Sequence, residues 1–370
     1  MGEESKVVQV QLSYTQTDEE AGEPEVCRVV AMGKRSWLWW VRISVFSALV
    51  LSGQASATLL GRLYFQEGGH SKWLETLVQI IGFPILLPYF FFVDPKMRVP
   101  TDDDNVRDGE QLSLYGRMMF FLVSGVILAA GSMLFSVGLL YLPVSTFSLI
   151  SASQLAFTAI FAYFLNSQKF TALTINSIVV LTVSSILLVI QPNSASSNAT
   201  NPISSEKYAA GFVCTLLASA GCALLFNIAQ LYFQKVRDRT PIAAIFEYVI
   251  YESAIATAIV LVGLFASGEW RMLRQEMELF GLGKLSYVMT LTWTAITWQV
   301  CTIGVGGLIY EVSSVFTNVI SALGLPIVPV LAMVFFHDRM DGVKAISMVL
   351  AIWGFLSYVY QQYLDENCAK

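Results

Sequence analysis

The stretch at residues 298–336 constrains the fold most strongly. It is apolar and long enough to form two membrane-crossing helices, which a tight turn beside Tyr310 would separate. Uncharged polar side chains lie within it, and Gly324 and Pro326 interrupt its second half. Polar groups and helix breakers at bilayer depth are tolerated only where they face protein or a water-filled cavity. The stretch therefore predicts a polar cavity inside a helical bundle, which is typical of a transporter.

The composition extends this prediction to the whole chain. Hydrophobic residues make up 55% of the 370 residues and charged residues only 13%, against about 25% charged in a soluble domain. We therefore predict an all-α membrane protein with ten transmembrane helices. The expected helices are 37–60, 73–93, 118–141, 144–165, 170–191, 208–233, 242–265, 285–309, 312–336 and 343–364.

The hydrophilic segments set the expected orientation. Residues 1–35 are polar and acidic, and they predict a disordered tail; residues 365–370 form the other end. Lys and Arg are more frequent on the side that carries the two termini, so the positive-inside rule places both termini in the cytoplasm. The loop 192–206 then faces outside, where the sequon at Asn198 can be glycosylated.

Two halves of the chain follow the same scheme, one over 36–191 and the other over 207–364. The run at 141–145 (YLPVS) echoes the run at 310–313 (YEVS) at the matching place in each half. Because each half holds an odd number of helices, the halves insert with opposite orientation as two inverted five-helix repeats. Inverted repeats place the substrate near the bilayer midplane. The alternative is that all apolar helical hairpins look alike.

Glu247 and Glu252 are the carboxylates that we place inside a spanning helix. A buried ionised carboxylate is costly, so such a group is usually neutral, paired or functional. The two side chains point about 140° apart on one helix, and no Lys or Arg except Arg42 is expected at their depth. We interpret them as candidates for proton coupling; the alternative is a snorkelling or hydrogen-bonded glutamate.

Amide side chains are the candidates for substrate binding. Each presents a hydrogen-bond donor beside an acceptor, which matches the edge of a heterocyclic base. Five amides are expected in the membrane: Gln54, Gln79, Gln154, Gln299 and Asn318. Thr317 lies on the same polar stripe as Asn318 and is a further candidate. For each glutamine, a plain interhelical hydrogen bond is the alternative. Trp293 and Trp298 offer flat faces on which a base can stack.

Other classes of site are not indicated. The five cysteines have no metal-ligand or redox spacing, and the chain has only two histidines. No nucleotide-phosphate motif occurs. We therefore expect no enzyme, no cofactor, no metal site and no nucleic-acid partner.

Four runs of sequence resemble the plant purine permeases of the drug/metabolite transporter superfamily. They are GRLYFQEGGHSKWLETLVQIIGFPILL, LPVSTFSLISASQLAFTAIFAYFLNSQKF, WTAITWQVCTIGVGGLIYEVSS and FTNVISALGLPIVPVLAMVFFHDRM. The resemblance covers residues 37–364. It implies inverted repeats, a plasma-membrane location and proton-coupled import of adenine and of cytokinins, which are N6-substituted adenines. Gln299 and Asn318 lie in the resembling motifs WQV and FxNVIS, and Glu247 matches an acidic position of the family.

Together these observations predict an alternating-access importer of purine bases and adenine-type cytokinins. The base is held by Gln299 and Asn318, with help from the other amides, and a tryptophan stacks on it. Helix breaks at Pro84 and at Gly324 with Pro326 mark the expected gates. One alternative is a transporter of another heterocycle, such as an alkaloid or a vitamin. A more distant one is a membrane receptor or an intramembrane enzyme.

Overall fold

The computed structural model describes residues 37–88, 114–142, 147, 150–151, 153–167, 171–189, 205–236 and 241–324, with parts of 342–360. This part of the chain is helical. In chain order the elements are α1 Trp37–Gln66, α2 Lys72–Ile80, the 3-10 turn η1 Phe83–Leu86, α4 Leu114–Tyr141, α6 Gln154–Leu165, α7 Ala172–Val189, α8 Ser205–Lys235, α9 Pro241–Ser267, the 3-10 turn η4 Glu269–Arg271, α10 Leu273–Leu279 and α11 Lys284–Glu311. A further apolar helix covers Ser314–Gly324.

Within the described residues, five helices are long and apolar enough to cross a membrane: α1, α4, α8, α9 and α11. The protein is therefore a multi-pass membrane protein. The turn expected beside Tyr310 is present, because α11 ends at Glu311 and the next helix begins at Ser314. The expected tail 1–35, residues 192–204 of the expected loop and the end 365–370 lie outside the described residues.

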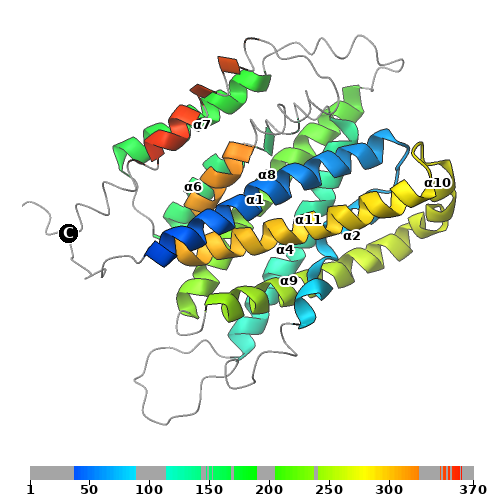
Figure 1. Cartoon of the computed structure of the whole chain (residues 1–370), viewed down its shortest axis with the longest axis horizontal. Helices are drawn as coiled ribbons and strands as arrows, with labels where there is room; N and C mark the ends of the chain where they lie inside the picture. The colour runs from blue at the N-terminus through cyan, green and yellow to red at the C-terminus, as the bar shows by residue number, and fades with distance from the viewer. Residues whose placement is uncertain are drawn as a thin grey trace, which may run out of the picture.

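Helices α1 and α11 run antiparallel and lie side by side along most of their lengths (Figure 1). Glycines make this close approach possible. A Cβ at Gly53 of α1 would lie 2.8 Å from the backbone nitrogen of Cys301, and one at Gly304 of α11 would lie 2.8 Å from the carbonyl oxygen of Phe46. Small residues allow transmembrane helices to pack backbone against backbone in this way.

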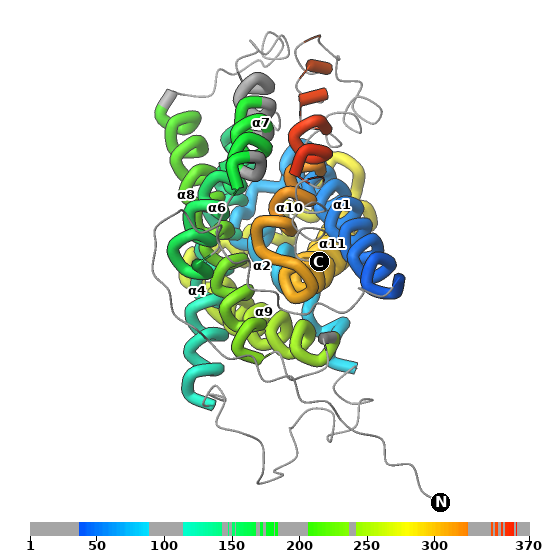
Figure 2. Tube along the Cα trace, turned by 90° about the vertical axis from the view of Figure 1, so that its left-hand side faces the viewer, coloured from blue at the N-terminus to red at the C-terminus, as the bar shows by residue number. Residues whose placement is uncertain are grey.

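The short helix α2 packs against α4, α9 and α11 (Figure 2). It begins at an N-cap, Ser71, whose hydroxyl oxygen accepts a hydrogen bond from the Leu74 N–H at 3.0 Å. The expected span 73–93 is interrupted soon after Ile80, where Gly82 and Pro84 lead into the turn η1. Proline lacks an N–H and disfavours helix in the residue before it, so the break follows from residue chemistry.

A carboxylate network fixes one end of the bundle. Glu276 of α10 accepts hydrogen bonds from the hydroxyls of Tyr64 and Tyr287, at 2.5 and 3.1 Å, and from the Ser71 N–H at 3.3 Å. Glu269 accepts from the Ser71 hydroxyl at 2.7 Å. The connection between α1 and α2 is therefore held to the connection between α9 and α11.

Candidate functional site

The interruption of α2 brings Gln299 of α11 against the backbone of Gly82. A Cβ at Gly82 would lie 2.6 Å from the Ala295 carbonyl oxygen and 3.2 Å from Gln299 Oε1, so only glycine fits here. Gln299 is 4% exposed, and its Nε2 is buried with no hydrogen-bond partner among the described residues. A buried amide donor without a partner is costly. Gln299 therefore keeps a free donor beside a helix break.

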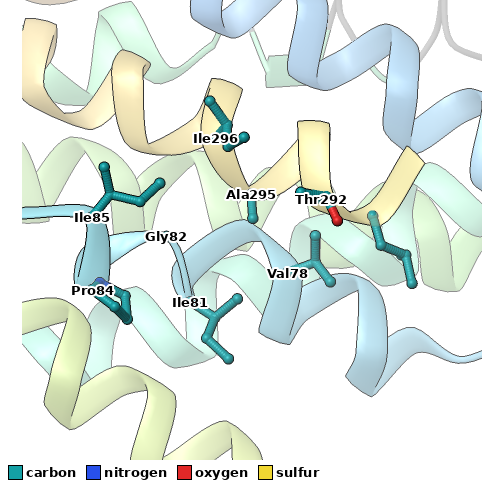
Figure 3. Close-up of a pocket in the computed structure, with 9 residues that line it drawn as sticks. Val78, Ile81, Gly82, Pro84, Ile85, Thr292, Ala295 and Ile296 are labelled. Atoms are coloured by element: carbon teal, nitrogen blue, oxygen red, sulfur yellow. The ribbon is translucent and has the colours of Figure 1, made fainter. Parts of the chain in front are cut away.

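An open groove of about 380 Å³ lies next to this contact, between the α2–η1 segment and α11 (Figure 3). Its size is at the lower end of the range for small-molecule sites. Thr292 supplies its one polar side chain; the lining is Val78, Ile81, Gly82, Pro84, Ile85, Leu291, Thr292, Ala295 and Ile296. Gln299 follows Ala295 by one helical turn. The predicted gate residue Pro84 thus lines a groove beside a predicted ligand residue.

Gln79 lies one turn before the break in α2. Its Nε2 donates to the Ser136 hydroxyl of α4 at 3.2 Å and lies 3.4 Å from Glu75 Oε1. Thr76 also donates to Ser136, at 2.9 Å. The structure therefore gives the Gln79 amide an interhelical partner, Ser136, whereas the Gln299 amide nitrogen has no partner among the described residues.

The two tryptophans differ in their surroundings. Trp298 is partly buried against the hydrophobic cluster that includes Val50, Val315 and Val319. Its indole Nε1 is buried and has no hydrogen-bond partner in the part of the chain that the structure describes. Trp293 is 50% exposed on the surface of α11. Of the two tryptophans, Trp298 is thus the one whose ring is shielded and whose indole N–H is available to a ligand.

Asn318 connects two helices. Its Nδ2 donates to the hydroxyl of Thr158 in α6 at 2.5 Å, and both residues are buried. Thr317 is also buried, but its hydroxyl donates to the carbonyl of Ser313, the residue just before its own helix, at 2.8 Å. Gln154 opens α6, and its main-chain carbonyl accepts from the Thr158 hydroxyl at 2.9 Å. Among the described residues, none of the five candidate amides hydrogen-bonds another.

A buried asparagine of α8 that sequence reasoning did not select is the centre of this region. Asn227 Oδ1 accepts from Asn166 Nδ2 at 2.7 Å and from the Ser314 hydroxyl at 3.1 Å, and Asn227 Nδ2 donates to the Thr158 carbonyl at 3.3 Å. One turn later, Gln230 accepts from the Ser314 N–H at 2.7 Å. The sequence signal that could have identified this region is the pair of amides, Asn227 and Gln230, at i and i+3 in an apolar helix.

Gln54 lies against the second predicted gate. Its Oε1 is 3.5 Å from the position that a Cβ at Gly324 would take. Gly324 is the last described residue of its helix. The predicted gate residue Pro326 and the predicted glycosylation site Asn198 lie outside the described residues.

The two predicted coupling glutamates have different partners. Glu247 forms an ion pair with Arg117 of α4. The expectation that only Arg42 lies at this depth is therefore wrong: α4 begins at Leu114, ahead of the expected 118, and carries Arg117 into the bundle. Arg42 instead pairs with Glu311 at 3.3 Å.

Glu252 is 4% exposed and pairs with no cation in the described part of the chain. Its Oε1 lies 3.4 Å from the hydroxyl of Tyr248, which is also 2.8 Å from the Ser124 hydroxyl of α4. A hydroxyl stabilises a buried carboxyl much less than a cation does. Of the two predicted glutamates, Glu252 is thus the uncompensated one.

Comparison with known families decides the class. The family model described as "Purine nucleobase transmembrane transport" (PUNUT) matches residues 41–368. The chain belongs to the purine permease family. Its relatives in Arabidopsis thaliana include purine permease 21, which is 53% identical over 90% of this chain and 83% of the relative, and probable purine permease 8, which is 52% identical over 90% and 82%. The resemblance seen in the sequence is confirmed, and the function is purine nucleobase transport.

Membership of this family also removes the distant alternatives, because the purine permeases are transporters and not enzymes. A solved structure titled "Crystal structure of protein" shares the fold, with a TM-score of 0.56 over 86% of this chain and 98% of that chain. The identity to it is 13%. That likeness concerns the fold alone.

Proposed function

We propose that the protein imports purine bases and adenine-type cytokinins by proton-coupled alternating access. The observation that carries the substrate part is Gln299, a buried amide with a free donor beside an open groove and a helix break. An adenine edge offers the ring-nitrogen acceptor that this donor lacks. Binding of the base would satisfy a polar group that is otherwise unpaired, and this favours a base over an apolar ligand.

In this proposal the base lies near the midplane, with Gln299 and Asn318 as its main hydrogen-bonding partners and Gln54, Gln79, Gln154 and Thr317 around them. Trp298, and not Trp293, stacks on the base, because the Trp298 ring is shielded whereas Trp293 is half exposed. Asn318 then exchanges its bond to Thr158 for one to the base. Pro84, Gly324 and Pro326 mark the hinges of the two gates.

The proposed architecture has ten spanning helices in two inverted repeats, 36–191 and 207–364, with both termini in the cytoplasm and the loop 192–206 outside. The bond between Asn318 and Thr158 supports it, because these residues lie on the fourth helix of each proposed half. The expected location is the plasma membrane. Glycosylation at Asn198 would establish which side that loop faces.

Proton coupling is assigned to the carboxylates of α9. Glu247 is compensated by Arg117, whereas Glu252 is buried without a cation among the described residues. A carboxyl in that position is held more easily in its neutral form, so proton uptake and release at Glu252 can accompany the change of access. Glu247 with Arg117 then serves as a fixed pair between α4 and α9.

The substrate class is tested by uptake of labelled adenine into yeast that lacks its own purine importer. We expect saturable uptake that unlabelled trans-zeatin blocks and pyridoxine does not. Uptake of pyridoxine or an alkaloid, with no uptake of adenine by protein at the cell surface, would favour a transporter of another heterocycle and contradict this proposal.

A further inference from the structure

A third carboxylate, Glu75, is buried in the bundle, at the first turn of α2. The residue is 1% exposed. A Cβ at Gly61 of α1 would lie 2.8 Å from Glu75 Oε1 and 3.1 Å from Leu139 of α4. Gly61 therefore leaves room for a carboxyl group between three helices.

The Glu75 carboxyl is poorly compensated. Oε1 lies 3.4 Å from Gln79 Nε2, a long contact, and Oε2 is buried with no hydrogen-bond partner among the residues that the structure describes. In the part of the chain that the structure describes, no ion pair reaches it. An ionised carboxylate in such surroundings is strongly disfavoured, and a neutral one is tolerated.

The titratable groups on the helices around Glu75 are mostly tyrosines and carboxylates. Tyr64 of α1 interacts with it electrostatically and also donates to Glu276. On its own helix, Lys72 lies with its ammonium 5.7 Å from the ring centre of Tyr141 of α4. The helices that pack against α2 carry these further titratable groups: Tyr115 and Arg117 of α4, Glu247, Tyr248, Tyr251 and Glu252 of α9, and Lys284, Tyr287, Cys301, Tyr310 and Glu311 of α11.

Glu75 is also joined to the candidate substrate site along α2. Gln79 follows it by one turn, and the break at Gly82, where Gln299 packs, follows Gln79. A carboxylate can only accept a hydrogen bond from the Gln79 amide nitrogen, whereas a carboxylic acid can donate to the amide oxygen. A change of protonation at Glu75 therefore favours a turned Gln79 amide and alters its bond to Ser136.

We propose that Glu75 carries a coupling proton, as a second proton site beside Glu252; this inference rests on the proton-coupled function proposed above. The proton enters from the outer side, on which the proposed orientation places the start of α2, and neutralises Glu75. It leaves after the change of access, with release of the base. The two buried glutamates then belong to the second helix of each proposed repeat, α2 and α9.

The test compares Glu75→Gln, Glu252→Gln and a surface control, Glu278→Gln, in the full-length protein in yeast, normalised to protein at the cell surface. Glu278 has a half-exposed side chain that pairs with Lys284. Two quantities are measured: accumulation of labelled adenine, and its exchange against unlabelled adenine at equal concentrations with the proton gradient abolished. Exchange requires binding and access changes but no net proton movement.

We expect Glu75→Gln to retain exchange within about twofold and to lower the accumulation ratio of adenine about fiftyfold for each 100 mV of driving potential, which is the contribution of one proton. Glu278→Gln should match the unaltered protein. An accumulation ratio in Glu75→Gln equal to that of the unaltered protein would overturn the inference while the proposed function stands. Loss of exchange as well would assign Glu75 a structural role and also overturn it. If the unaltered protein accumulates no adenine in response to the proton gradient, both this inference and the proposed proton-coupled function are contradicted.

A measurement on the unaltered protein covers the case in which Glu75→Gln does not reach the surface. Dicyclohexylcarbodiimide adds to protonated carboxyl groups in apolar surroundings, and the adduct is located by mass spectrometry of peptides. We expect labelling at Glu75 that decreases as the pH is raised. Absence of an adduct at Glu75 at every pH, with labelling at Glu252, would contradict the proposal.

Discussion

The Asn318 amide and the Thr158 hydroxyl, 160 positions apart in the chain, form a buried hydrogen bond of 2.5 Å. It joins α6 to the helix Ser314–Gly324 at the place where both carry polar side chains. A ligand that accepts a hydrogen bond from the Asn318 amide must replace its bond to Thr158. The interaction is therefore placed to respond to substrate.

Asn318→Ala should abolish adenine uptake with normal surface expression, because it removes both the interhelical bond and the proposed contact to the base. Thr158→Val removes the interhelical bond and the bond of the same hydroxyl to the Gln154 carbonyl, but it leaves the Asn318 amide in place for the base. It should therefore reduce uptake by less than about tenfold, the effect of one neutral hydrogen bond. Uptake assays at matched surface protein compare the two. Equal losses in both variants would show that Asn318 acts only as a packing residue.

Gln299→Ala should raise the KM for adenine, since the free amide donor beside Gly82 is lost. The expected weakening is about 2 kcal/mol, or roughly thirtyfold. Gln275→Ala is the matched control, because Gln275 is an exposed amide on α10. An unchanged KM in Gln299→Ala would remove this residue from the binding site.

Substitution of the two glutamates of α9 should have different effects, one on stability and the other on the pH dependence of uptake. Glu247→Gln leaves Arg117 partly buried without its partner, which costs about 3 kcal/mol of stability. We expect a lower melting temperature in detergent, partly restored by the exchange Arg117→Glu with Glu247→Arg. Glu252→Gln should keep its melting temperature and flatten the dependence of uptake on external pH. A melting temperature lowered only in Glu252→Gln, with a pH profile flattened only in Glu247→Gln, would reverse the two roles.

Gly53→Ala should destabilise the protein, because the added methyl group meets the backbone of α11 at 2.8 Å. Overpacking of this kind costs about 1–3 kcal/mol. In Gly131→Ala, the nearest atom to the new methyl group is Cys222 Sγ at 3.8 Å, so this helical glycine should accept alanine without loss. Thermal unfolding in detergent measures both; equal stability would contradict the packing between α1 and α11.

Among the described residues, five of the ten expected spanning helices are confirmed, whereas the neighbours of individual side chains were not predicted. The five long helices follow from length and hydropathy, and the break at Pro84 follows from residue chemistry. Periodicity along one helix identifies a polar face but does not name the helix opposite. The partners of Asn318 and Gln79 were for this reason beyond prediction.

The charged residues near helix ends show the same limit. Arg117 lies next to a hydrophilic segment and was assigned to it, although α4 extends past it and pairs it with Glu247. Glu75 lies in the first turn of its helix, where a carboxylate is usually a solvated N-terminal residue. Its burial depends on Gly61, a contact between helices that the sequence does not reveal.

The most direct test of proton-coupled import uses the purified protein in liposomes that are preloaded at neutral pH and diluted into acidic buffer with labelled adenine. Proton coupling predicts transient accumulation above the external concentration, abolished by a protonophore, with exchange of adenine unaffected. Uptake that only reaches the external concentration, with or without the pH gradient, in vesicles that still exchange adenine would contradict it.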